Sequence, residues 1–242
     1  MSSLEQSFKR SIDDEKFILK QIENPEEKPF YILSLIQINT IFFLYRFFVQ
    51  KDVQLSKSFL YKIAGTFAYY HEKLNGEVFE ALKTFTYPLL CDNNTVVNRY
   101  QDYHKTKYSD SFSTYFAKAI QSTLKNDNSA LEVNIAGLKK WSRKGWPKQY
   151  IGIITVFEGF LINDKSAIEN GLQEITDLHD KQDQPPIVKD YINLEATALA
   201  KLAWRKGIEV EVASDLVPKE LLPVLELQSY EGYPFFEELS NY

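Results

Sequence analysis

Two glutamates lie among apolar residues at helical spacing, and they are the strongest candidates for chemistry in this chain. Most side chains three and four positions from Glu158 and from Glu195 are apolar, so each carboxylate is expected on the apolar side of a helix. A buried carboxylate must be paired, hydrogen-bonded or protonated. Two such groups form an acid/base pair in some enzymes. We favour separate structural anchors, and we predict that Arg46, which follows Phe42 and Phe43, is the buried partner of Glu195.

The other chemically reactive side chains do not form a known motif. Histidine occurs three times, as His71, His104 and His179, without the paired spacing of a metal site. Cys91 follows two leucines, which is typical of a small core residue. There is no glycine-rich phosphate loop, serine elbow or dinucleotide fingerprint. We therefore predict no catalytic residue, no metal and no cofactor, and a metal-dependent helical hydrolase that uses Glu158, Glu195 or a histidine is the weakest alternative.

The composition limits the class of protein. At 242 residues the chain is long enough to bury a substantial core. It has 17 Phe and 15 Tyr but only 9 Gly and 9 Pro, which argues against all-β and dinucleotide-binding folds. Its single Cys excludes internal disulfide bonds. Residues 1–17 are charged and lack the apolar stretch of a secretion signal, so we expect a cytoplasmic protein.

Helical periodicity runs through most of the chain and predicts an all-α fold. The expected helices cover residues 4–22, 30–49, 56–74, 77–90, 111–125, 129–144, 149–162, 166–180 and 187–206, with a weak helix between 92 and 108. After Gly207, three apolar residues alternate with glutamates over 208–212, which predicts a short, strand-like extended segment.

A short sequence echo indicates how the helices pair. Residues 124–131 (LKNDNSAL) resemble residues 161–168 (LINDKSAI), each stretch joins two expected helices, and residues 73–77 form a poorer third copy. Such spacing is typical of stacked helical hairpins. We predict one domain, a compact array of antiparallel helical hairpins. Its parts are N-terminal helices in 1–98, hairpins in 110–206 and an acidic C-terminal cap in 207–242.

The segment 30–49 is the most apolar in the chain and approaches the length of a membrane span. It contains Gln37, Asn39 and Arg46, and an arginine that faces lipid is costly. We therefore interpret it as the central helix of a soluble bundle and expect no membrane association.

Charge is distributed unevenly along the sequence. The net charge is −1 over residues 1–98, +6 over 99–148 and −10 over 149–242. Because the chain is acidic overall, general nucleic-acid binding is not expected. The basic middle could bind a phosphate backbone, but we interpret it as a solvated helix face. After Gly207 there are eight acidic residues and one lysine. The aromatic residues among them are typical either of a protein-binding surface or of a tail that folds back onto the core. The predicted partner-binding residues are Glu209, Glu211, Asp215, Glu231, Glu237 and Glu238.

The stretch from Tyr191 to Ala203, YINLEATALAKLA, is followed by Arg205, Lys206 and Gly207, by alternating valines and by a Leu-x-Pro-x-x-Leu-Leu pattern over residues 216–222. This pattern resembles the immunity protein 49 family of bacterial polymorphic toxin systems, and the likeness covers about residues 150–223. A second family, the immunity partners of PoNe-type DNase toxins, carries a similar Tyr-x-x-x-Glu-Ala helix. Both resemblances imply a mostly helical cytoplasmic inhibitor without catalysis.

The resemblance and the absence of a catalytic motif lead to one expected function. The protein is expected to bind a cognate bacterial toxin and to neutralise it by direct contact. An acidic surface speeds association with a basic partner. The alternative is a helical-repeat scaffold that binds another partner. The sequence does not determine the oligomeric state.

Overall fold

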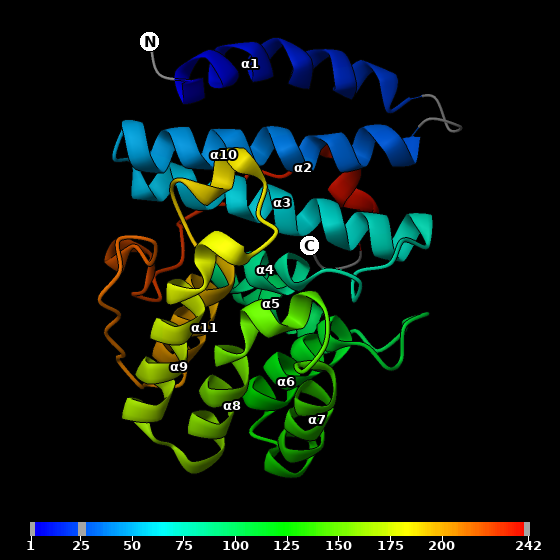
Figure 1. Ribbon diagram of the computed structural model, residues 1–242. Coiled ribbons are helices and arrows are strands. Elements are labelled where there is room, and N and C mark those ends of the chain that lie inside the picture. Colours follow the sequence, from blue (N-terminus) through cyan, green and yellow to red (C-terminus); the bar gives the residue numbers. More distant parts are fainter. Residues whose placement is uncertain (1–2, 24–27, 240–242) are drawn as a thin grey trace.

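The computed structural model describes residues 3–23 and 28–239, and the described part contains eleven α-helices and no β-strand (Figure 1). The helices are α1 (Ser3–Gln21), α2 (Lys28–Leu44), α3 (Val53–Leu74), α4 (Thr86–Leu90), α5 (Asn94–Gln101), α6 (Phe112–Lys125), α7 (Asn128–Trp141), α8 (Gly152–Ile162), α9 (Lys165–Asp177), α10 (Pro186–Lys189) and α11 (Leu194–Arg205). The predicted all-α fold is confirmed. The division into three parts stays a prediction.

Helix α2 is the middle layer of an N-terminal stack, with α1 on one side and α3 on the other (Figure 1). It continues into a π-helical turn, η1 (Tyr45–Val49). By length and composition Lys28–Val49 is able to cross a membrane, but 56% of its apolar window is buried inside the structure. Leu35, Phe43 and Leu44 are fully buried. These contacts favour the interpretation of this segment as a core helix.

Two helical hairpins follow, and their turns have the same geometry. Helices α6 and α7 form one hairpin, and α8 and α9 form the other (Figure 1). In each turn an asparagine ends the first helix in the left-handed conformation, Asn126 with φ 56° and Asn163 with φ 54°. The next residue, Asp127 or Asp164, accepts a hydrogen bond from a backbone amide and caps the second helix. The repeated turn is therefore confirmed.

Two predicted helices are wrong in their extent. Residues 77–81 are not helical, and the chain becomes helical only at a 3-10 turn over Leu82–Phe85, followed by α4. Glu77 instead accepts a hydrogen bond from the amide of Phe79. The expected helix 187–206 is split into α10 and α11, because Asn193 leaves the helical conformation and caps α11 through the amide of Ala196.

The C-terminal segment from Gly207 to Leu239 wraps around the helices. Residues 208–212 are extended but pair with no strand in the described part of the chain. A 3-10 turn, η6 (Pro234–Glu238), packs against α3. Tyr233, Phe235 and Phe236 are buried, so the tail folds back onto the core. The Tyr233 hydroxyl accepts a hydrogen bond from Asn39 at 2.7 Å.

Helices α8 and α9 approach each other at two glycines. A Cβ atom on Gly171 would lie 2.7 Å from the carbonyl oxygen of Gly152, and one on Gly152 would lie 2.3 Å from that of Gly171. Real Cβ atoms do not come this close to backbone oxygens. The close contact therefore explains why a residue with poor helix propensity lies inside α9.

Replacing Gly171 with Ala should lower the free energy of unfolding by about 1–3 kcal/mol, because the backbones have to separate. Asn170→Ala is the matched control at the neighbouring exposed position, and it should be neutral or slightly stabilising. Urea denaturation followed by circular dichroism measures both changes. A stabilised Gly171→Ala variant would contradict the close packing of α8 and α9.

Candidate functional site

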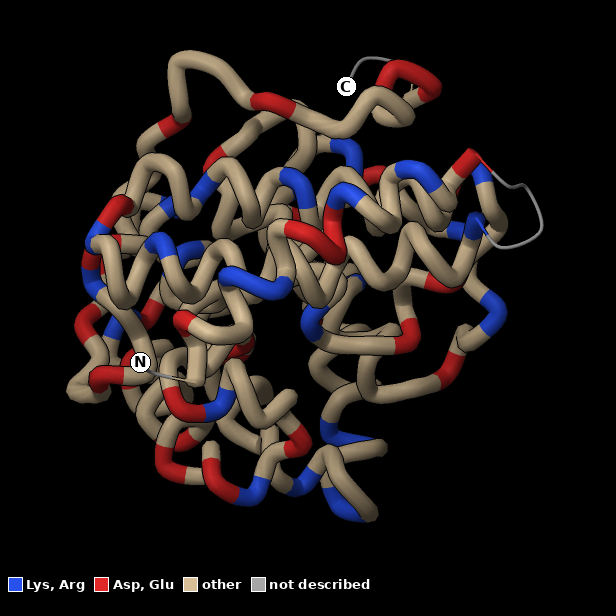
Figure 2. The backbone as a smooth tube through the Cα atoms, turned by 90° about the horizontal axis from the view of Figure 1, so that it is seen from above, with Lys and Arg blue, Asp and Glu red and all other residues tan. Residues whose placement is uncertain are grey.

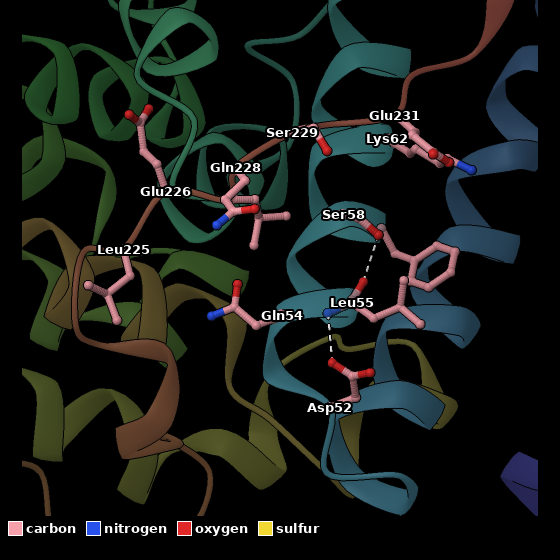
Figure 3. Close-up of a pocket in the computed structure, with 12 residues that line it drawn as sticks. Asp52, Gln54, Leu55, Ser58, Lys62, Leu225, Glu226, Gln228, Ser229 and Glu231 are labelled. Carbon is pink, nitrogen blue, oxygen red and sulfur yellow. Dashed lines mark hydrogen bonds between the residues drawn. The ribbon is translucent and has the colours of Figure 1, made fainter.

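An open groove of about 840 Å³ runs between α3 and the C-terminal segment (Figure 3). One wall is the N-terminal half of α3 with its capping residue Asp52, and the other wall comprises residues 225–229 and 231. Leu225 is 58% exposed and Leu55 is 36% exposed, so the groove presents apolar surface to solvent. Exposed apolar surface with a polar rim marks interaction sites in many proteins.

The groove carries more acidic than basic side chains. Asp52, Glu226 and Glu231 line it together with one cation, Lys62. The Lys62 ammonium lies over the ring of Tyr233, 4.9 Å from its centroid. Two of the carboxylates also form hydrogen bonds within the molecule. Asp52 accepts a hydrogen bond from the backbone amide of Leu55, and Glu226 accepts one from the backbone amide of Asn94. Glu231 is exposed and is the best placed of the three for an intermolecular contact.

A buried charge cluster holds the second wall of the groove in place. Asp92 lies between two lysines, with Lys57 Nζ 2.6 Å from its Oδ2 atom and Lys201 Nζ 2.6 Å from its Oδ1 atom. Arg205 Nη2 lies 3.4 Å from the same Oδ1 atom. Asp92, Lys57 and Lys201 are each 1% exposed or less. These four residues, the Asp92 cluster, join α3, the α4–α5 link and α11.

The Asp92 cluster also binds the backbone of the C-terminal segment. Lys201 donates to the carbonyl oxygens of Leu221, at 2.7 Å, and Pro223, at 2.6 Å. Lys57 donates to the carbonyl oxygen of Leu225 at 3.2 Å, and the Leu225 amide donates to Asp92 at 3.3 Å. Burial lowers the pKa of Lys201 to about 8, and the nearby carboxylate of Asp92 opposes that effect. The start of the second wall is therefore fastened by charge-assisted hydrogen bonds.

Sequence reasoning missed the Asp92 cluster. Its one local signal is the Asp-Asn-Asn stretch that begins at Asp92, where Asp92 has φ 60°. Acidic residues and asparagine tolerate that left-handed conformation better than most residues do. Nothing in the sequence pairs this aspartate with a lysine 109 positions later.

The six predicted partner-binding residues are all exposed, and they fall into two groups. Glu209, Glu211 and Asp215 lie on the extended stretch after α11, whereas Glu231, Glu237 and Glu238 lie around the C-terminal turn. Figure 2 shows red acidic stretches along the chain that leads to the C-terminus. Of these six residues, Glu231 lines the groove between α3 and the C-terminal segment, and Asp215 lines another groove. Partner binding by these residues stays a prediction.

Glu238 is engaged within the molecule. It accepts a hydrogen bond from the Tyr69 hydroxyl at 3.0 Å and lies 3.7 Å from Lys28. This hydroxyl contact and the Lys28 contact bring η6 close to α2 and α3. Glu238 therefore contributes to the position of the tail as well as to its negative charge.

Two predictions about buried polar residues are wrong. The Glu158 side chain is 44% exposed and forms an ion pair with Lys139 of α7 at 2.6 Å, so it lies at the edge of the contact between α7 and α8 rather than in the core. Arg46 does not contact Glu195. It donates to Gln50 and lies over the Phe8 ring, 5.3 Å from its centroid, because its position in η1 directs it towards α1.

Glu195 is buried, as predicted, but its partner is neutral. The side chain is 3% exposed and accepts a hydrogen bond from Gln184 Nε2 at 2.7 Å. Burial raises the pKa of Glu195 above its usual value, and the Gln184 hydrogen bond opposes that effect only in part.

The cysteine and the buried histidine of the described residues have structural surroundings and are not gathered at a metal site. No group of three or more His, Cys, Asp or Glu residues in this part of the chain is placed to hold a metal ion. Burial raises the pKa of Cys91 to about 12, so its thiol is a poor nucleophile. His179 is buried, with Nδ1 accepting from Asn193 at 2.9 Å and Nε2 donating to the Lys189 carbonyl at 2.7 Å. Both ring nitrogens are therefore used within the fold, and this histidine is structural.

Replacing Asp92 with Asn should lower the free energy of unfolding by about 3 kcal/mol, because three cations would lose their buried counter-charge. Asparagine keeps the shape of the side chain and tolerates the left-handed backbone, so the change isolates the charge. Asp215→Asn, at an exposed position, is the matched control and should change stability by less than about 0.5 kcal/mol. Equal denaturation midpoints for the two variants would contradict the role assigned to Asp92.

Replacing Glu195 with Gln should change how stability depends on pH. The folded-state pKa of Glu195 lies above the unfolded value, so its protonation favours folding at low pH, and that contribution is lost as pH rises through the folded pKa. The amide does not titrate, so the stability of the variant relative to the wild type should rise as the pH is raised from 5 to 7. Urea denaturation across this range measures the difference. A constant difference between pH 5 and pH 7 would show that folding does not raise the pKa of Glu195.

The comparison with known proteins is specific for one family. A family model described as "Immunity protein 49" matches residues 75–221, which is more than half of the chain. The match extends further towards the N-terminus than the likeness seen in the sequence, and it includes Asp92, Glu195, Lys201 and Arg205. No curated protein and no solved structure matches the chain. The chain belongs to the immunity protein 49 family.

Proposed function

We propose that this protein binds a cognate bacterial toxin and neutralises it by direct contact in the cytoplasm. The observation that carries the proposal is its membership of the immunity protein 49 family. Immunity proteins protect the cell that makes a toxin, so the partner is a toxin domain that reaches the same compartment. The described residues contain no group of three or more His, Cys, Asp or Glu placed to hold a metal ion, which favours inhibition by binding over metal-dependent chemistry.

The groove between α3 and the C-terminal segment is the proposed centre of the contact. Leu225 and Leu55 supply exposed apolar surface, and acidic side chains surround them. Apolar centres with polar rims are the usual anatomy of protein interfaces. Glu209, Glu211 and Asp215 add further exposed negative charge to the C-terminal segment. A toxin that acts on nucleic acid needs basic residues, and these would be attracted to this surface.

A scaffold that binds another partner is the second candidate function. The matching turns of the α6–α7 and α8–α9 hairpins favour it, because stacked helical hairpins are common in scaffold proteins. The two functions differ in one observable property. An immunity protein rescues cells from a specific toxin, whereas a scaffold does not.

Co-expression distinguishes the two functions. The product of the gene next to this one is expressed in a susceptible strain with and without this protein, and the two chains are then co-purified. The proposal expects toxicity, rescue and a stable complex. Rescue without a complex would indicate an enzyme that reverses the damage, and toxicity without rescue would contradict the immunity function for that pair.

Reversing the charge of Glu209, Glu211 and Asp215 to Lys should weaken toxin binding at low salt by tenfold or more, mainly through slower association. Because the attraction has been removed, the affinity of the variant should depend less on salt than that of the wild type. In the control variant, Asp13, Asp14 and Glu23 are replaced with Lys. This variant has the same net charge as the test variant, but its substitutions lie at exposed positions outside the C-terminal segment. Surface plasmon resonance at two salt concentrations measures both. Equal losses in the two triple variants would indicate that only the overall charge matters.

Replacing Leu225 with Arg tests the groove itself. The side chain is 58% exposed, so the change should leave the free energy of unfolding within about 0.5 kcal/mol of the wild-type value. If Leu225 contacts the toxin, a cation at this position should accelerate dissociation by tenfold or more. Val133→Arg is the control, since Val133 is also a well-exposed apolar residue and lies on α7. Unchanged dissociation from the Leu225 variant would move the interface away from the groove.

A further inference from the structure

A second pocket, of about 330 Å³, has Glu195 among its lining residues. Its other walls come from residues 80–83 at the start of η2 (Leu82–Phe85), the start of α6, the η3 turn (Trp146–Tyr150) and residues 183–185. The volume lies at the lower end of the range for small-ligand sites. This pocket shares no lining residue with the groove in Figure 3.

Two aromatic rings form part of the pocket wall. Trp146 and Tyr150 lie edge to face, with ring centroids 5.6 Å apart and an angle of 84° between the planes. Trp146 is 46% exposed although a tryptophan gains much from burial, and Tyr150 is buried beneath it. An exposed indole at the mouth of a pocket offers a face for a cation or an apolar chain.

The pocket is negatively charged. Glu80, Asp183 and Glu195 line it together with one basic residue, Lys83. No lysine or arginine in the described part of the chain forms an ion pair with Glu195, whose hydrogen-bond partner is the neutral amide of Gln184. Burial of a carboxylate without a cation is costly, and a bound cation would remove that cost.

The helix ends at the pocket do not oppose this charge. Ser113 and Glu195 lie in the first turns of α6 and α11, where the positive end of the helix dipole favours an anion. Glu195 is itself that anion when it is ionised. A ligand that keeps Glu195 ionised therefore gains from the carboxylate and leaves its interaction with the helix end intact.

We propose that this pocket binds a guanidinium or ammonium group carried on an alkyl chain, with Glu195 as its counter-ion and Trp146 against the chain. Carboxylate and aromatic groups together recognise such cations in proteins. The ligand is either an arginine or lysine side chain of a partner protein or a free small amine. The proposal does not depend on the toxin, because the pocket and its charges belong to this chain alone.

Binding should depend on pH in a defined direction. Burial raises the pKa of Glu195, so a fraction of the molecules carry a protonated Glu195 under mildly acidic conditions. The titratable groups that act on Glu195 or are affected by it are Lys83, His179, Tyr87 and Tyr150, and the pocket also contains Glu80 and Asp183. A cation selects the ionised carboxylate, so affinity should rise from pH 5 to pH 7.5 and binding should release protons.

Isothermal titration calorimetry with N-acetyl-L-arginine amide tests the proposal. N-acetyl-L-citrulline amide is the matched probe, because it has nearly the same shape without the charge. The arginine derivative should bind at least tenfold more tightly. Glu195→Gln should remove that preference, and Glu231→Gln, in the other groove, should retain it. Titration with agmatine, a free guanidinium compound without the amide groups, distinguishes a free small amine from a partner's side chain as the source of the ligand. Tighter binding of either charged probe than of the citrulline probe supports the site.

Two further variants keep the test independent of folding. Asp183→Asn and Trp146→Ala change exposed positions, and each should weaken binding of the arginine derivative by threefold or more without loss of the folded circular dichroism signal. Equal binding of the arginine and citrulline probes to the wild-type protein, or no binding of either charged probe (arginine amide or agmatine), would overturn the proposal. So would an affinity for arginine amide that Glu195→Gln leaves unchanged.

Discussion

The fold depends on one buried carboxylate that is shared by three cations. Asp92 contacts Lys57, Lys201 and Arg205 at distances between 2.6 and 3.4 Å, and so it brings α3, the α4–α5 link and α11 together. The formal charge of these four residues is positive, so one carboxylate alone does not balance it. Backbone carbonyl oxygens of the C-terminal segment complete the coordination of the two lysines. Folding of that segment is thereby tied to the burial of the charges, since neither is favourable alone.

This arrangement connects the fold to the proposed binding surface. The carbonyl oxygens bound by the cluster belong to residues 221–225, and the second wall of the groove begins at Leu225. Tyr233 and the turn at Pro234–Glu238 hold the far end of the segment against α3. An acidic chain without such anchors would be repelled by its own charge. The anchors keep the acidic side chains exposed on a fixed backbone, which lowers the entropic cost of binding a partner.

Local signals in the sequence were sufficient for much of the architecture. The Asn-Asp turns at 126–127 and 163–164 are recognisable from the sequence. In each turn the asparagine ends the first helix in the left-handed conformation, and the aspartate caps the second helix. The break at Asn193 was missed, although asparagine is a good capping residue, because the apolar pattern continues across it. The pairing of Arg46 with Glu195 was wrong for another reason, because periodicity places each side chain on the apolar side of its helix but does not show which helices pack together. Glu158 was misplaced for a related reason, since periodicity does not show which side of a helix a neighbour leaves open.

The Asp92 cluster was beyond such reasoning because its members are far apart in the sequence and each resembles a surface residue. Lysine is a residue type typical of the surface, and the burial of Lys57 and Lys201 became evident only from the packing of α4 against α3 and α11. The same holds for the pocket at Glu195, whose walls come from five separate stretches of chain. Sites built from distant segments need the tertiary structure before their chemistry can be judged.

The central claim is that the Asp92 cluster holds the C-terminal segment and so forms the groove. Hydrogen–deuterium exchange of the wild-type protein and of Asp92→Asn, under conditions where both remain folded, tests it most directly. The account predicts much faster exchange in peptides covering residues 219–231, including the Leu225 amide that donates to Asp92, while α6–α9 keep their protection. Unchanged protection of residues 219–231 in the variant would contradict the account.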